Sequence, residues 1–435
     1  MEGSLVGLLG IVVLLAVLLF TRMPVGFAMA LVGFLGMGYV VSAKAALNMV
    51  GTEIWQIFSS YGLTVIPLFI LMGEVTFYCG VSERLYNATY KWMGQIRGGV
   101  AMATVMACAG FAAICGSNTA TAATMSTVAL PEMKKYRYNP ILSTGAVASG
   151  STLGVVIPPS VVLIVVGLYT GQSIGKLFFG GVIPGLILTG LFVLTIYILC
   201  TIREDWGPPG PKTTFLEKLQ ALPGAVEMVV LFLLVMGGLY MGWFTPSEAG
   251  AAGAFSAMVL SLLRRTLNWE RFVAAVMDTL KLSCMIFIIV TGAVIFGRFL
   301  TVTRLPYEAA KWAASLPIPH VVILAIVLVI YIIGGAVMDA LAFLLVTLPI
   351  FYPVIIAMGY DPIWYGVLIT VITTMGAVTP PVGVNTYVVA GVAKDVPLGS
   401  IFKGVTFFLP AYVICAAIMI LFPDVVLFLP KLLRG

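Results

Sequence analysis

The chain has 435 residues, of which 61% are hydrophobic and only 9% are charged. This composition excludes a soluble domain, which would need a larger charged surface, and predicts an all-α polytopic membrane protein embedded in the lipid bilayer. The net charge of +6 does not indicate a nucleic-acid partner, because the Lys and Arg residues are scattered over short loops between apolar runs.

Four apolar runs in the first half are long enough to cross a membrane, and they lie at about residues 4–20, 24–41, 61–80 and 176–200. A segment at about 98–132 is predicted to form a re-entrant helical hairpin, which enters and leaves the membrane on one side. A broken helix is predicted at about 140–170. Together these parts form a first repeat, residues 1–205.

Residues 206–221 are predicted to form a cytoplasmic linker, because they contain the sequence Gly207-Pro208-Pro209-Gly210-Pro211. The same parts then recur in the same order over a second repeat, residues 222–435. Its predicted elements are spans at about 225–242, 247–263, 281–300 and 402–428, a hairpin at about 320–350 and a broken helix at about 362–393. Each repeat has five spans plus one hairpin, and an odd number of crossings makes the two repeats inverted relative to each other.

The two broken helices share a motif at a constant offset. Gly154-Val155-Val156-Ile157-Pro158-Pro159 is matched 222 residues later by Gly376-Ala377-Val378-Thr379-Pro380-Pro381. Two prolines remove N–H donors and free the carbonyls one turn earlier, and free carbonyls are tolerated in a membrane only where they face protein or bind something. Paired, interrupted apolar segments in two halves of a membrane protein indicate the binding site of a transporter. The pattern therefore favours a carrier.

The distribution of cations supports this arrangement. With the N-terminus outside, sixteen Lys and Arg residues fall in the cytoplasm and seven outside, in agreement with the positive-inside rule. The seven outer cations are Lys44, Lys176, Arg298, Arg304, Lys311, Lys431 and Arg434. The sequence Lys134-Lys135-Tyr136-Arg137 follows the first hairpin, which is therefore predicted to open to the cytoplasm. Only Asp361 follows the second hairpin, which is predicted to open to the outside.

The first hairpin turns at Gly116-Ser117-Asn118-Thr119-Ala120-Thr121. Glycine and short polar side chains let a chain reverse, and Ser or Asn caps the N-terminus of the returning helix. That end carries the positive pole of the helix dipole, which suits a carboxylate, while carbonyls at an opposing helix end suit a cation. Close packing through small residues is the alternative, and we prefer it only for Ala122 and Ala123.

The second hairpin turns at Gly334-Gly335-Ala336-Val337-Met338-Asp339. Asp339 lies at bilayer depth, where an ionised carboxylate is costly unless it is paired. Two interpretations stay open: Asp339 is a structural acid bonded to backbone amides at a helix N-terminus, or it belongs to the ion site or a gate. Glu74 and Glu248 lie near span ends and are interpreted as structural.

Oxygen ligands with little formal charge, from the hairpin tips and the broken helices, suit a weakly held monovalent cation such as Na+. The candidate cation-binding residues are Ser117, Asn118, Gly154, Ile157, Pro159, Gly335, Gly376, Thr379 and Pro381. The candidate solute-binding residues are Ser117, Thr119, Ser160, Asp339, Gly383 and Asn385. No catalytic residue, no organic cofactor and no metal other than Na+ is predicted.

Several separated motifs resemble the large membrane subunit of TRAP transporters: Gly116-Ser117-Asn118-x-Ala120-Thr121, Gly154-x-x-Ile157-Pro158-Pro159-Ser160, Thr245-Pro246-x-Glu248 and Pro380-Pro381-Val382-Gly383-x-Asn385. The match spans essentially the whole chain. Two positions depart from the pattern, because relatives often carry a second serine in place of Asn118 and a glutamate in place of Asp339. For that reason no individual solute is transferred.

The resemblance implies a member of the ion-transporter superfamily in the bacterial inner membrane, working as an elevator-type transporter. It implies sodium-coupled import of a small carboxylate, often a C4-dicarboxylate or a sialic acid. It also implies two protein partners, a small four-helix membrane subunit and a periplasmic substrate-binding protein.

Three rival functions differ in what they require. A stand-alone sodium–dicarboxylate carrier would need no binding protein, and the motif Thr245-Pro246-x-Glu248 disfavours it. An intramembrane protease needs a base near a serine or two facing acids, yet the single histidine is His320 at a span entrance and the only acid that qualifies is Asp339. A channel is disfavoured because paired hairpins imply alternating access.

The charge difference between the hairpin flanks predicts opposite accessibility. A cysteine placed near Tyr136 is expected to react only with a membrane-impermeant reagent applied from the cytoplasm, and one near Gly359 only from outside. Cysteine labelling in oriented vesicles measures this. Reaction of both positions from one side would contradict the inverted repeat.

Overall fold

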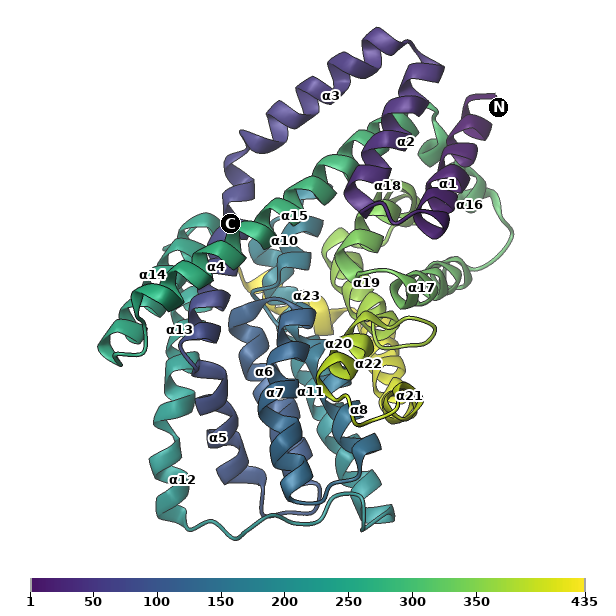
Figure 1. Cartoon of the computed structure of the whole chain (residues 1–435). Coiled ribbons are helices and arrows are strands. Elements are labelled where there is room, and N and C mark those ends of the chain that lie inside the picture. The colour runs from purple at the N-terminus through teal and green to yellow at the C-terminus, as the bar shows by residue number, and fades with distance from the viewer. Residues whose placement is uncertain (1, 434–435) are drawn as a thin grey trace.

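The computed structural model describes residues 2–433, and within them the regular structure consists of helices without any strand. Nine helical segments of this described part are long and apolar enough to cross a membrane (Figure 1). The prediction of an all-α polytopic membrane protein is therefore confirmed. Arg434, one of the seven predicted outer cations, lies outside the described residues.

The first half contains the predicted spans, the hairpin and the broken helix. The spans are α1 Glu2–Phe20, α2 Val25–Val40, α4 Val65–Tyr78 and α11 Ile174–Ile202. The hairpin consists of α6 Gly99–Cys115 and α7 Asn118–Lys135, and the broken helix of α8 Pro140–Ser151, α9 Leu153–Val156 and α10 Val161–Thr170. Polar side chains accept backbone N–H groups at the starts of these helices, with Ser117 capping α7, Asn139 capping α8 and Ser160 capping α10.

The second half repeats these boundaries closely. Its elements are α13 Pro223–Tyr240, α14 Pro246–Leu263, α15 Trp269–Val302, the hairpin α17 His320–Val337 and α18 Ala340–Ala357, and the broken helix α19 Pro362–Gly376 and α20 Val384–Val392. Helix α18 begins and ends 222 residues after α7, and α19 begins 222 residues after α8. The motif offset thus extends to the helices themselves.

The span predicted at 402–428 has different bounds in the structure: a segment apolar enough to cross a membrane covers Leu398–Leu421, and this part of the chain forms three helices. They are α21 Leu398–Thr406, α22 Leu409–Leu421 and α23 Asp424–Leu432. Pro410 lies in the first turn of α22, and Pro423 is the N-cap of α23. Proline lacks an N–H and is accommodated at a helix start, so these two residues separate the helices.

Shorter helices that the apolar pattern did not predict join the spans. They are α3 Ala43–Phe58, α5 Val81–Met93, α12 Phe215–Ala221 and α16 Leu305–Ser315, whereas the 3₁₀ turn η1 Tyr61–Thr64 begins the predicted span at 61–80. All carry polar residues that interrupt the apolar runs. The predicted linker is therefore partly helical, and a reciprocal capping box between Thr214 and Glu217 starts α12.

Helix α15 runs obliquely across the molecule, and α2 and α4 pack along it (Figure 1). Close backbone approach makes the α2–α15 contact possible: a Cβ on Gly292 would lie 2.0 Å from the Gly26 carbonyl oxygen. Arg298 of α15 also forms an ion pair of 2.7 Å with the nearly buried Glu53 of α3. These contacts build a frame around the hairpins.

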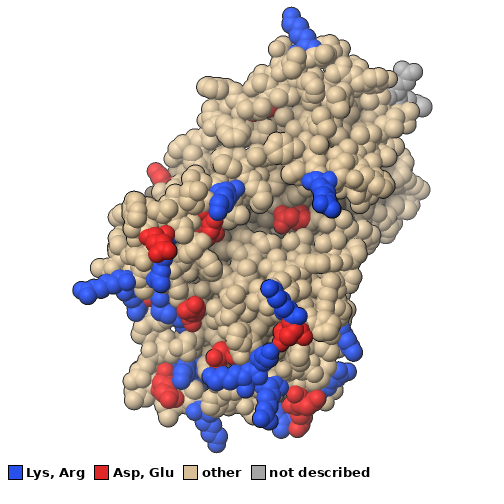
Figure 2. Space-filling model, viewed as in Figure 1, with Lys and Arg blue, Asp and Glu red and all other residues tan. Residues whose placement is uncertain are grey.

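Charged side chains gather at the end of the molecule that carries α12, whereas the opposite end shows few of them (Figure 2). At the charged end Lys134 of α7 forms an ion pair of 2.5 Å with Asp395, which follows α20. The hydrogen bond from Lys134 lowers the pKa of the Asp395 carboxyl. This pair connects the first hairpin to the end of the second broken helix.

A substitution at Gly376 tests how closely α17 of the second hairpin packs against α19 of the second broken helix. A Cβ at this position would lie 2.5 Å from the Ile332 carbonyl oxygen and 2.8 Å from the Gly335 Cα, both rigid backbone atoms. We expect Gly376→Ala to destabilise the protein by about 1–3 kcal/mol through overpacking, measured as a lower thermal unfolding midpoint in detergent. The matched control is Gly237→Ala in α13, where an added Cβ meets nothing within 4 Å. Equal midpoints for the two variants would contradict this packing.

Candidate functional site

The tip of the first hairpin is organised by its own backbone. Gly116 adopts a left-handed conformation (φ 65°) that ends α6 and favours glycine. Ser117 then caps α7 by accepting a hydrogen bond from the Ala120 N–H, as predicted. The Thr121 hydroxyl donates to the Ser117 carbonyl oxygen over 2.7 Å. The 18-residue helix α7 therefore begins at the tip of the hairpin.

This tip contacts the first broken helix through backbone atoms. The Val161 N–H donates to the Gly116 carbonyl oxygen over 3.4 Å. A Cβ on Gly154 would lie 2.5 Å from the Ser117 carbonyl oxygen, so only glycine fits at that place. The structure thus brings together Ser117 and Gly154, which were predicted from separate motifs.

The second half repeats the arrangement. The N–H groups of Val382 and Gly383 donate to the Ala336 carbonyl oxygen over 3.1 and 2.9 Å. Gly335 and Gly376 meet at the crossing of α17 and α19, where neither has room for a side chain. Both Pro-Pro bonds, Pro158–Pro159 and Pro380–Pro381, are cis. Each break is therefore bonded to the tip of the hairpin in its own half.

One small cavity lies between the two hairpin tips. Its volume is about 80 Å³ and its polar lining consists of Glu74, Ser117, Asn118, Thr119 and Asp339. Apolar residues of α4, α10 and α15 complete the wall. A space of this size holds an ion or a few waters, so a larger solute requires movement of a hairpin.

Asp339 is the N-cap of α18, and its carboxylate accepts the Leu341 N–H over 3.0 Å. This is the backbone bonding that the structural interpretation predicts. The same side chain also lines the cavity. Because one carboxylate oxygen position remains available beyond the cap, the cap does not prevent a role in binding.

Two buried asparagines carry an amide atom without a hydrogen-bond partner among the described residues. Asn118 is 5% exposed; its Oδ1 accepts from the Thr119 N–H, but its Nδ2 has no partner. Asn385 is fully buried; its Nδ2 donates to the Ser151 hydroxyl over 3.0 Å, but its Oδ1 has no partner. An unpaired buried polar atom is costly. Asn118 therefore suits an acceptor such as a carboxylate, and Asn385 suits a donor or a cation.

The remaining predicted residues lie around the breaks and do not line the cavity. Ser160 is buried and caps α10, and Ile157 packs against Gly185 of α11. The Thr379 hydroxyl donates to the Met375 carbonyl oxygen over 2.6 Å, and the Thr379 N–H donates to the Gly376 carbonyl oxygen over 2.8 Å. Pro381 is exposed. The Thr379 hydroxyl oxygen and the Gly376 carbonyl oxygen each keep a lone pair that is not used in these hydrogen bonds.

Sequence reasoning missed Glu74, which was interpreted as a structural acid near a span end. It lies within α4 on the cavity wall, beside the hairpin tips. An acid in an apolar span was the signal, since such residues mark functional sites by default. Glu248, by contrast, is structural as expected, because it forms a capping box with Thr245 at the start of α14. Ser151, the partner of Asn385, had no local signal.

Comparisons with known proteins identify relatives over the whole chain. A family model described as the tripartite ATP-independent periplasmic transporter, DctM component, matches residues 12–425. The C4-dicarboxylate TRAP transporter large permease protein of Pseudomonas aeruginosa is 33% identical, over 89% of this chain and 90% of that protein. The sialic acid TRAP transporter large permease protein of Vibrio cholerae is 29% identical, over 100% of this chain and 99% of that protein. The solved Alcanivorax borkumensis YdaH transporter shares the fold at 14% identity, with a TM-score of 0.56 over 88% of this chain and 90% of that one.

Proposed function

Because the chain belongs to the DctM family of tripartite ATP-independent periplasmic (TRAP) transporters, we propose that it imports a small organic acid by sodium-coupled, elevator-type alternating access. It does so as a multi-pass protein of the bacterial inner membrane, with a small four-helix membrane subunit and a periplasmic substrate-binding protein. One observation carries the proposal: the two hairpin tips meet at a single polar cavity, and each tip is bonded to a broken helix.

The cavity suits an anionic group on one side. The N-termini of α7 and α18 both reach it, and the unpaired N–H groups of a helix N-terminus favour negative charge. The unpartnered Asn118 Nδ2 is a further donor there. A carboxylate of the solute binds to these donors.

Two protein carboxylates, Glu74 and Asp339, line the same cavity and would repel that solute if nothing neutralised them. A cation bound with the solute removes this repulsion. The solute therefore binds well only when cations are present, which is the physical basis of coupled transport. Oxygen atoms at the breaks, from Thr379, Gly154 and Asn385, are suited to Na+ because they carry no formal charge.

Hairpins and broken helices move together in this proposal, while α2, α4, α14 and α15 form the stationary frame. The hydrogen bonds between each tip and its break support a single moving body. The Asn385–Ser151 hydrogen bond joins the two broken helices across the halves. Sliding of such a body exposes the cavity first to one side of the membrane and then to the other.

The relatives differ in the solutes that their names give, which include C4-dicarboxylate, sialic acid and ectoine. We therefore propose the class, an organic acid, and no individual solute.

The stand-alone dicarboxylate carrier is the alternative function among transporters. An enzyme is ruled out by the family, although the sequence argument that only Asp339 qualifies as an intramembrane acid is wrong, because Glu74 shares its cavity.

Reconstitution tests the division of labour. We expect liposomes containing this chain and its small subunit to take up solute only with the binding protein and an inward sodium gradient. A panel of radiolabelled succinate, N-acetylneuraminate and isethionate, each with its own binding protein, measures this. Uptake by the chain alone, driven by sodium without either partner, would establish the stand-alone carrier instead.

The hydroxyls at one hairpin tip and at the opposite break test the cation sites. Ser117→Ala and Thr379→Val each remove one candidate ligand and keep the shape. We expect each to weaken the apparent sodium affinity of transport about tenfold, as for one lost buried hydrogen bond. Thr370→Val is the matched control, because its hydroxyl bonds only within α19. Unchanged sodium dependence in both site variants would show that the two hydroxyls are structural.

A further inference from the structure

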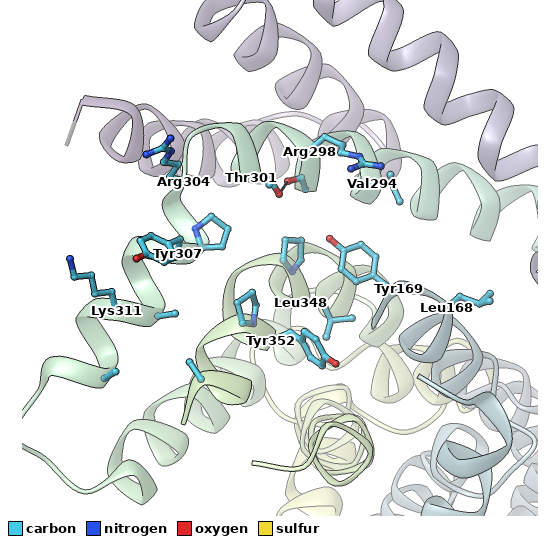
Figure 3. A pocket seen from close by; sticks show the side chains of 17 residues that line it. Leu168, Tyr169, Val294, Arg298, Thr301, Arg304, Tyr307, Lys311, Leu348 and Tyr352 are labelled. Carbon is cyan, nitrogen blue, oxygen red and sulfur yellow. Dashed lines mark hydrogen bonds between the residues drawn. The ribbon is translucent and has the colours of Figure 1, made fainter. Parts of the chain in front are cut away.

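A second and much larger cavity lies away from the hairpin tips (Figure 3). Its volume is about 870 Å³, and it is an open cavity lined by the C-terminal part of α15, by α16, by α18 and by the end of α10. It shares no lining residue with the cavity between the tips. We call it the outer vestibule, because its cations are among those predicted to face outside.

The charge of the outer vestibule has one sign. Arg298, Arg304 and Lys311 line it, and no acidic residue does. Arg298 is neutralised by Glu53 at 2.7 Å. Arg304 and Lys311 have no carboxylate within ion-pair distance among residues 2–433, and the exposed Glu308 of α16 is not in the lining. The vestibule therefore carries two uncompensated positive charges.

Hydroxyl groups complete the polar lining. Tyr307 lies on α16 beside Lys311, while Tyr169 and Tyr352 lie on the opposite wall (Figure 3). Thr301 of α15 lies between Arg298 and Arg304, the N-cap of α16 (Figure 3). Gln172 donates to the Tyr352 hydroxyl over 3.1 Å, which holds that ring in place. Cations and hydroxyls together supply the donors that an oxyanion requires.

The first half contains a cavity between the corresponding helices, here called the counterpart cavity, and its charge is different. It lies between α5 and α7, the helices that correspond to α16 and α18, and has a volume of about 580 Å³. Most of its lining comes from other positions of these helices, since Arg304 and Lys311 correspond to Ser82 and Thr89, which do not line it. Two acids, Glu83 and Glu132, line it together with two cations, Lys91 and Lys135. The Glu132–Lys135 pair is 3.5 Å apart. The positions of Arg304 and Lys311 are thus held by uncharged residues in the first half, and the positive charge does not follow from the repeat.

We propose that the outer vestibule is a separate binding site for a small organic oxyanion, a carboxylate or a sulfonate, held by Arg304, Lys311 and the surrounding tyrosine hydroxyls. Its position on the outer side, and its use by the imported acid before the acid reaches the hairpin tips, rest on the proposed function. The phosphate of an anionic lipid shares this chemistry and is distinguished from the solute below. The counterpart cavity, with balanced charges, does not retain the anion.

Rates of cysteine modification report the charge and the occupancy of the vestibule. We would place the reporter at Thr301, which is exposed in the vestibule, and replace Cys284, the one exposed cysteine among the described residues. In detergent, Thr301→Cys is expected to react faster with an anionic methanethiosulfonate than with a cationic one, relative to Asn87→Cys in the counterpart cavity. Two nearby positive charges are expected to make the ratio of the anionic to the cationic reaction rate about fivefold higher at Thr301→Cys than at Asn87→Cys. Arg304→Gln with Lys311→Gln is expected to remove this difference.

Protection identifies the ligand. Succinate, isethionate and N-acetylneuraminate, added at constant ionic strength, are the probes. At least one is expected to slow modification of Thr301→Cys, and the effect is expected to disappear in the Arg304→Gln/Lys311→Gln variant and to return with Arg304→Lys/Lys311→Arg. Absence of protection by all three overturns the proposal. Protection only in nanodiscs of phosphatidylglycerol, and not of phosphatidylcholine, assigns the site to lipid and overturns the solute site.

Uptake separates this inference from the proposed function. If the reconstituted wild-type complex transports a solute, the double glutamine variant is expected to raise the KM several-fold with little change in kcat, and Lys91→Gln/Lys135→Gln is expected to leave the KM unchanged. Wild-type transport with an unaffected KM in the double glutamine variant overturns the vestibule as part of the import route. Failure of the wild-type complex to transport contradicts the proposed function instead, and the protection experiment still decides the site.

Discussion

Backbone polar groups inside a membrane must find partners within the protein, and the centre of this structure depends on that requirement. The Pro-Pro breaks interrupt helical bonding at bilayer depth. The hairpin tips meet the need: the Gly116 carbonyl accepts the Val161 N–H, and the Ala336 carbonyl accepts two N–H groups of the second break. Glycines at 154 and 376 let the backbones approach closely enough. Each hairpin is thereby bonded to the break in its own half.

This bonding has a consequence for binding. Since both helix N-termini are drawn to one place, their dipoles and the Asn118 amide favour an anion there, while Glu74 and Asp339 oppose it. A site with opposing charges discriminates between the solute alone and the solute with cations. The cavity between the tips is too small for an organic acid, so the proposed solute site is closed in this structure.

The two halves share a backbone plan but differ in charge. The cavities between α5 and α7 and between the corresponding α16 and α18 are lined mostly at different positions, and only the second has no acidic residue in its lining. Frame contacts also differ, because the first half divides into α3 and α4 what the second half builds as the continuous α15. Repetition therefore supplies the geometry, and substitutions within it give the two sides of the protein different chemistry.

Features that depend on neighbours in the chain were predictable. The repeated Gly-x-x-x-Pro-Pro motif located both breaks, and short polar residues located the hairpin turns and the caps at Ser117 and Asp339, because helix interruption and capping act over a few residues. Amphipathic helices such as α5 and α16 were not predicted, because charged residues interrupt their apolar runs. The span expected at 402–428 lies at Leu398–Leu421, because Pro423 separates the last helix, α23, from it.

The remaining features of the site depend on packing between helices that are distant in the sequence. Glu74 belongs to the cavity, and Asn385 bonds to Ser151, only because helices distant in sequence cross at those points. The outer vestibule likewise draws its lining from α10, α15, α16 and α18. No local pattern encodes which side chains of such helices face each other, since that depends on the crossing geometry of the whole bundle.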